Sequence, residues 1–196
     1  MRLVARMRRR LGAQGGYTLV EMLTVLLILG VVMGGLTTVV ASATNADADM
    51  NNRFQAQQAT RLAMDKLRRE IHCSSSATPA ATATSSITLT LPSYCKTYSG
   101  SVSVTWCTRN VSTNRYALYR VNGSTCTGGV KWADFLTPTS TAIVCSGALC
   151  VFNYAAQSAT SLAKLHVDFP VNPKPTRTVD TYELVDDLVL RNSTRS

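Results

Sequence analysis

The sequence predicts an α+β protein in which one long N-terminal helix precedes a β-rich region. Three observations carry this prediction. Residues 22–43 contain no charged side chain, residues 44–72 switch to a one-sided apolar repeat, and residues after 86 alternate apolar and polar side chains in short runs. A helix followed by a series of strands is the element order of an α+β fold, and we expect the strands to pair antiparallel and to pack on the helix.

Residues 17–43 form the first predicted element, a transmembrane helix. The charge-free run from Met22 to Ala43 has about 22 residues, enough to cross a hydrocarbon core of ~30 Å. The preceding segment is rich in arginine, with Arg2, Arg6, Arg8, Arg9 and Arg10. Because positive residues beside a membrane helix stay in the cytoplasm, we expect a cytoplasmic N-terminus and an extracytoplasmic C-terminal region.

The formal charge of +9 is concentrated in that short segment. Five of the 20 basic residues precede residue 11, so a chain that begins at residue 17 keeps 15 basic and 11 acidic residues, a net charge of +4. This modest excess gives little support for a nucleic-acid partner.

The apolar segment allows three interpretations. It could be a plain membrane anchor, or a secretory signal cut after Ala41-Ser42-Ala43, although its apolar core is longer than such signals usually have. Glu21 counts against both, because an ionisable group within a membrane segment is costly and indicates a function with a partner.

The third interpretation accounts for Glu21. The string GGYTLVEM at residues 15–22, with arginines before it and an apolar run after it, resembles the class III signal of type IV pilins and type II secretion pseudopilins. The resemblance implies that residues 1–16 are a leader, that a prepilin peptidase cuts between Gly16 and Tyr17, and that it methylates the new amine of Tyr17. It also implies that Glu21 pairs with the terminal amine of a neighbouring pilin or pseudopilin subunit in a filament. No cofactor is implied.

Residues 44–72 predict an amphipathic continuation of the helix. Its apolar positions recur at spacings of three and four: Ala56, Ala59, Ala63, Leu67 and Ile71, with Met64 beside them and Met50 and Phe54 extending the stripe. The opposite, polar face is expected to hold Arg61, Asp65, Lys66, Arg68, Arg69 and Glu70. In the apolar half, Gly30 and Gly34 match the small-xxx-small pattern for close helix approach, which is weak evidence by itself.

Residues 73–86 are rich in Ser, Thr and Ala and predict a loop. Residues 87–196 predict an extracellular β-rich domain. The expected strands are 87–91, 102–106, 115–121, 142–145, 149–154, 164–169 and 182–191, with a tight turn at Ser146-Gly147 and a break at Pro170.

All six cysteines follow the apolar helix: Cys73, Cys95, Cys107, Cys126, Cys145 and Cys150. An even number in an exported region predicts disulfides, with 15 pairings open. A zinc site is the alternative, but no closely spaced C-x-x-C pair occurs. The pair Cys145 and Cys150 flanks the expected hairpin, and Cys107 and Cys126 bracket a strand, so each pair could bridge locally.

The sequence contains no recognisable catalytic or metal motif, so we expect no enzyme activity and no metal site. His72 lies at a helix end and His166 on the polar face of a strand, and both are expected at the surface. Asp186 and Asp187 are adjacent on a strand, so they should point to opposite faces rather than share calcium.

The preferred hypothesis is therefore a minor structural subunit of a type IV pilus-like or type II secretion filament, anchored in the bacterial cytoplasmic membrane. Two alternatives stay open. One is a binding module at a filament tip for DNA, a surface or cargo, and the other is a plain membrane-anchored extracellular protein.

Overall fold

The computed structural model describes residues 16–80, 82–96, 100, 102–174, 177 and 180–192. It contains one helix, α2 (Leu19–Cys73), among the described residues. The strands that follow are β1 (Ser76–Thr78), β2 (Ala83–Thr84), β3 (Ser86–Thr90), β4 (Ser103–Ser112), β5 (Arg115–Asn122), β6 (Val130–Leu136), β7 (Val144–Cys145), β8 (Ala148–Leu149), β9 (Phe152–Ala155), β10 (Lys164–Val171) and β11 (Tyr182–Val189). The predicted α+β class is confirmed, with a long apolar N-terminal helix and an antiparallel sheet.

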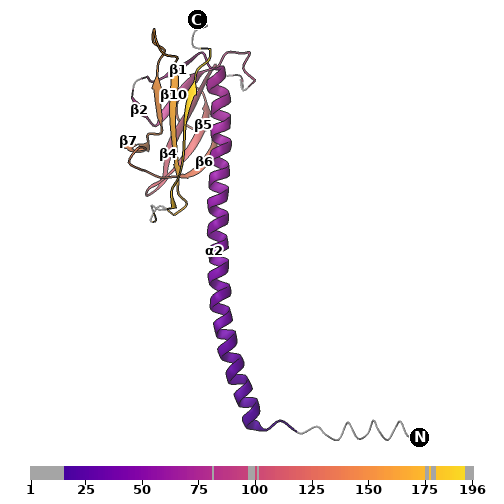
Figure 1. Cartoon of the computed structure of the whole chain (residues 1–196). Helices are drawn as coiled ribbons and strands as arrows, with labels where there is room; N and C mark the ends of the chain where they lie inside the picture. Colours follow the sequence, from indigo (N-terminus) through magenta and orange to yellow (C-terminus); the bar gives the residue numbers. More distant parts are fainter. Residues whose placement is uncertain are drawn as a thin grey trace, which may run out of the picture. The chain divides into compact units, whose positions relative to one another are not determined.

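The chain divides into two compact units, with the boundary between Asp49 and Met50. In the first unit the described residues are those from Gly16 to Asp49, which are helical from Leu19 onward. The second unit holds the remaining turns of α2 and every strand. Figure 1 shows those turns lying alongside the sheet.

The main sheet has the strand order β1-β3-β4-β5-β6-β10-β9-β2, and β11 pairs with the other side of β10. Every pairing is antiparallel. Strand β10 is the junction, since it pairs with β11 along its whole length, with β9 at its start and with β6 at Val171. A separate hairpin, β7 and β8, turns at Ser146-Gly147 as the sequence predicts.

The core of the second unit lies between α2 and the sheet. The helix buries the predicted stripe of Ala56, Ala63, Met64, Leu67 and Ile71, with Thr60 between them. Thr60 is tolerated there because its hydroxyl donates to the carbonyl of Ala56 at 2.8 Å. From the sheet, the largest fully buried side chains include Trp106, Phe152 and Phe169.

The structure differs from the sequence-based expectation in four strands. Residues 73–86 are not only loop, because β1 pairs with β3 and β2 pairs with β9. Strand β6 is absent from the prediction, and it pairs with β5 through register shifts that disturb the alternation. Pro170 does not break β10. It pairs with Glu183 of β11, and its carbonyl accepts a hydrogen bond from the amide of Thr137 at 3.0 Å, just past the end of β6, where a missing donor interrupts little of the ladder.

Candidate functional site in the N-terminal segment

The helix start is built by Thr18. Its hydroxyl accepts a hydrogen bond from the amide of Glu21 at 3.3 Å, and its carbonyl accepts the first helical bond from Met22 at 3.1 Å. Thr18 is therefore the N-cap and Glu21 the third helical residue, the T-x-x-E spacing of a capping box. Sequence reasoning missed Thr18 as a functional residue, although this spacing could have identified it.

Glu21 lies in the first turn of α2 and is exposed. A carboxylate in the first turn is stabilised by the partial positive charge of the unpaired amides. The predicted cleavage residues Gly16 and Tyr17 precede the cap outside the helix, and both are exposed. Gly15 and the arginines at 2, 6, 8, 9 and 10 lie outside the described residues.

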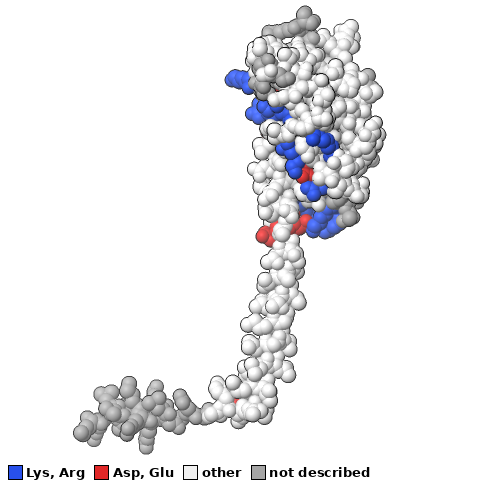
Figure 2. Space-filling model, turned by 180° about the vertical axis from the view of Figure 1, so that it is seen from behind, with Lys and Arg blue, Asp and Glu red and all other residues white. Residues whose placement is uncertain are grey.

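The apolar part of α2 has large hydrophobic side chains on all its faces, and all of them are exposed. Their exposed fractions run from 48% at Leu29 to 77% at Leu19. Figure 2 shows this part of the chain as a surface almost free of charged side chains. The helix is long and apolar enough to cross a membrane, and an exposed apolar surface of this extent requires lipid or other protein around it.

The polar side chains of this apolar stretch are satisfied locally. The hydroxyls of Thr24, Thr37, Thr38 and Ser42 each donate to the carbonyl three residues earlier, at 2.8–2.9 Å. A hydroxyl bonded within its own helix can enter lipid without leaving a donor unpaired. Glu21 is therefore the one group between Thr18 and Ala43 that would carry a charge into such an environment.

The glycines of the apolar stretch have empty space where a side chain would project. A Cβ atom added at Gly30, Gly34 or Gly35 would meet nothing within 4 Å. Within this single chain, then, no close contact requires these glycines, and the predicted small-xxx-small face stays a prediction.

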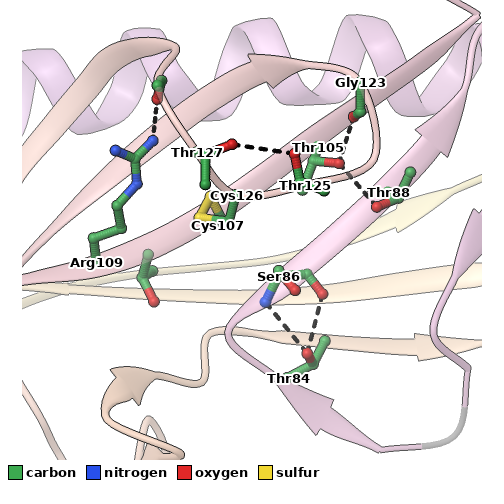
Figure 3. Close-up of a disulfide and its surroundings, with 12 residues drawn as sticks. Thr84, Ser86, Thr88, Thr105, Cys107, Arg109, Gly123, Thr125, Cys126 and Thr127 are labelled. Carbon is green, nitrogen blue, oxygen red and sulfur yellow. Dashed lines mark hydrogen bonds between the residues drawn. A yellow bond between two sulfur atoms is a disulfide. The ribbon is translucent and has the colours of Figure 1, made fainter.

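The six cysteines form three disulfides in the second unit: Cys73–Cys95, Cys107–Cys126 and Cys145–Cys150. Cys73 is the last residue of α2, so its bridge joins the helix end to the segment after β3. Cys107–Cys126 joins β4 to the loop after β5 (Figure 3). Beside it, the Thr105 hydroxyl donates to the carbonyl of Gly123 at 2.7 Å and lies 2.9 Å from the hydroxyl of Thr88.

Glu70 was expected on the polar face of α2, and that expectation is wrong: its exposed fraction is 0%. One carboxylate oxygen accepts from the indole of Trp106 at 2.7 Å, and the other accepts from Arg120 at 2.8 Å. Trp106 and Arg120 are directly opposite each other on β4 and β5. Lys66, one turn earlier, lies 3.4 Å from Glu70, so the carboxylate joins the helix to the sheet.

The two histidines differ in exposure and in partners. The ring nitrogen Nδ1 of His72 lies 3.0 Å from the carbonyl of Val189, and the side chain is partly buried rather than fully at the surface. His166 is exposed and lies 2.8 Å from Asp187. No group of three or more His, Cys, Asp or Glu that could hold a metal ion occurs among the residues that the structure describes.

Asp186 and Asp187 have separate partners. Asp186 accepts from Arg68 of α2 at 2.5 Å, whereas Asp187 accepts from Lys164 at 3.0 Å and contacts His166 on the neighbouring strand. The hydrogen bonds from His166 and Lys164 hold the pKa of Asp187 below its usual value. Adjacent residues on a strand point to opposite faces of the sheet, so the separate partners of Asp186 and Asp187 agree with the sequence-based expectation.

Comparison with known proteins identifies the N-terminal segment. Residues 11–37 match the family model of the prokaryotic N-terminal methylation motif, and this range includes Gly16, Tyr17, Thr18 and Glu21. Comparison of the chain with the curated proteins and with the solved structures gives no match. The motif and the exposed apolar helix that continues beyond it support the predicted resemblance to a prepilin of the type IV pilin and pseudopilin type.

Proposed function

We propose that this protein is a structural subunit of a type IV pilus-like or type II secretion filament, cut by a prepilin peptidase between Gly16 and Tyr17. The observation that carries the proposal is Glu21, a carboxylate in the first turn of an exposed, otherwise charge-free apolar helix within the matched methylation motif. The arginine-rich leader stays in the cytoplasm, and the β-rich unit lies outside the membrane.

The proposed role of Glu21 follows from the free energy required to place its carboxylate in lipid. An isolated carboxylate in an apolar medium is strongly unfavourable, while one paired with an opposite charge is not. Cleavage after Gly16 creates an ammonium at Tyr17, four residues before Glu21, which methylation leaves positively charged. Pairing between Glu21 of one subunit and this ammonium of its neighbour would stabilise one register of helix association.

The cleavage step is tested by mass spectrometry of the protein purified from membranes. We expect a mature chain that begins at methylated Tyr17. A Gly16→Val variant, whose branched side chain obstructs the peptidase, should remain at full length. A mature chain that begins after Ala43 would instead identify a secretory signal and would overturn the proposal.

The assembly step is tested with Glu21→Gln, which removes the charge and keeps the shape. We expect this variant to insert into the membrane and to be cleaved normally, but to be lost from sheared filaments by at least about tenfold, since charge-assisted hydrogen bonds contribute ~1.5–3 kcal/mol. Glu183→Gln, at an exposed position of β11, is the control with the same change of net charge and should assemble normally. Equal incorporation of both variants would contradict the role of Glu21.

We further propose a minor rather than a major subunit. The support is the irregular, cysteine-rich character of the β-rich unit. It has three disulfides, two strand pairs with register shifts, and the β7–β8 hairpin outside the main sheet. Quantitative mass spectrometry of filaments should find this chain at a few per cent or less of the major subunit, and near-equal amounts would exclude the assignment.

A further inference from the structure

A pocket of about 250 Å³ lies on the sheet beside the segment that carries the β7–β8 hairpin. Its rim consists of the exposed residues Ala83, Thr141, Asn153 and His166, and its floor of the buried residues Cys150, Val151, Phe152 and Asp168. The rim residues come from β2, β9, β10 and the segment before β7. The pocket therefore depends on the folded β-rich unit alone.

Asp168 is the unusual member of this lining. It is only 5% exposed, and the hydroxyl of Thr141 donates to its Oδ2 at 2.6 Å. Its other oxygen, Oδ1, is buried and has no hydrogen-bond partner among the described residues. A buried carboxylate requires a compensating charge or donor, because the unsolvated anion is costly.

Two basic side chains on the same face are already engaged. Lys164 and His166 precede Asp168 on β10 at alternate positions, so all three point to one side of the sheet. Both contact Asp187 of β11, at 3.0 Å and 2.8 Å. Among the described residues, no ion pair joins Asp168 to a cation of its own chain.

The lining indicates what kind of cation fits. A divalent metal ion needs several oxygen, nitrogen or sulfur ligands, and the described residues offer no cluster of three or more acidic, histidine or cysteine side chains. The pocket instead combines a single buried carboxylate with apolar side chains of Val151 and Ala83. Lysine and arginine have the matching shape, an apolar stem that ends in a cationic donor.

We infer that this pocket binds a lysine or arginine side chain of a partner polypeptide, with its stem against Val151 and Ala83 and its charged end on Asp168. Asn153 on the rim offers an amide to the partner's backbone. This recognition is independent of the filament role, because it uses no residue of the N-terminal helix.

The test uses the full chain in zwitterionic detergent, with methyl groups labelled for NMR. The probes are Nα-acetyl-lysine methylamide and Nα-acetyl-arginine methylamide, and the control is the uncharged Nα-acetyl-norleucine methylamide. We expect both cationic probes to shift the methyl signals of Val151 and Thr141 saturably, and Asp168→Asn to weaken binding at least about tenfold. Glu183→Gln, which removes an exposed carboxylate of β11 and leaves the contacts of Lys164 and His166 with Asp187 in place, should leave the affinity unchanged within about twofold.

A Thr141→Val variant tests whether weaker binding by Asp168→Asn results only from misfolding around the pocket. It keeps the Asp168 carboxylate and removes the one side-chain donor that the described residues give it, so it should bind the cationic probes at least as tightly as the unaltered chain. Three results would overturn the inference: an equal response to the norleucine probe, undiminished binding by Asp168→Asn, or a stronger response to CaCl₂ than to either cationic probe.

Discussion

At the scale of single residues, Glu70 determines how the helix and the sheet are joined. Its two oxygens are held by Trp106 and Arg120, and its side chain is fully buried. Burying an ion pair offsets much of its Coulombic gain through desolvation, so its net contribution to stability is small. Removing one partner has a different effect, because the other charge then stays buried without compensation.

Glu70→Gln should therefore lower the free energy of unfolding by about 3 kcal/mol, since the charged groups of Arg120 and Lys66 would then face a neutral amide in place of a carboxylate. Chemical denaturation of the full chain in detergent, followed by fluorescence of its two tryptophans, measures this change. Asp65→Asn on the same helix is the matched control, because Asp65 forms an exposed pair with Arg68 and its removal should cost at most about 0.5 kcal/mol. Equal effects of the two substitutions would contradict the role of Glu70.

Asp134 makes the stability of the β5–β6 pair depend on pH. Burial opposes its ionisation, but hydrogen bonds from Arg115 at 2.9 and 2.8 Å, from Lys131 and from the amide of Phe135 outweigh burial and lower the pKa from 3.8 to about 2. Because the folded pKa is the lower one, the stabilisation is present above pH 3.8 and is lost as the pH falls toward about 2.

Asp134→Asn should consequently cost about 1–2 kcal/mol of unfolding free energy at pH 6, a figure discounted for solvent screening, and much less at pH 2. Denaturation of both proteins at a series of pH values measures the difference. A difference that stays constant between pH 6 and pH 2 would show that ionisation of Asp134 is not its cause.

At the scale of elements, the loop between β5 and β6 is held tightly to the sheet. Cys126 bridges to Cys107, and Arg109 donates to the carbonyl of Gly128. Gly129 has a φ of 83°, and a Cβ added there would lie 2.4 Å from the carbonyl oxygen of Arg120. Gly128 also has a positive φ, 69°, but a Cβ there would meet nothing within 4 Å.

The two glycines provide a matched pair of substitutions. Gly128→Ala should cost about 1 kcal/mol through backbone strain alone, whereas Gly129→Ala should cost about 3 kcal/mol because the backbone of β5 must also move. Thermal denaturation of the two variants would measure the order. A larger loss of stability at Gly128 would mean that the close approach of Gly129 to the Arg120 carbonyl is not what makes a side chain unfavourable in this loop.

At the scale of the whole molecule, the disulfides constrain the unfolded chain unequally. Cys73 and Cys95 are 22 residues apart, while Cys145 and Cys150 are five apart. In the loop-closure model, replacing the first pair by serines should cost about 3 kcal/mol and replacing the second about 2 kcal/mol. Denaturant unfolding of the two double variants checks this order, and a reversed order would show that native contacts outweigh chain entropy.

The sequence predicts best those elements whose pattern is local. The charge-free run gives the apolar half of α2, and the spacing of three and four gives its buried stripe. Met50 and Phe54 follow the same spacing but are 67% and 64% exposed, since no part of the described sheet covers them. The stripe is therefore predictable, while the point at which it meets the sheet is not.

The missed features depend on contacts between distant residues. Glu70 has a polar side chain at a position that looks exposed, and only the pairing of β4 with β5 brings Trp106 and Arg120 to it. Asp168 alternates with His166 as an outward residue should, yet the segment containing Thr141 buries it. Of the N-terminal residues, Glu21 stands out in the sequence through its charge, and Thr18 could be predicted as the N-cap from the T-x-x-E spacing, which its bond to the Glu21 amide confirms.

The cap at Thr18 has a consequence for the energetics of maturation. The helix begins at Leu19, so the proposed cleavage after Gly16 would remove the leader without undoing any turn of α2. It would also place an ammonium just before the cap, at the end of the helix where the dipole is already positive, at a cost of ~0.3–1 kcal/mol near the surface. Processing would thus leave the fold unchanged but place the new ammonium beside the positive end of the helix dipole. A carboxylate supplied by another subunit would stabilise the ammonium and the helix end together.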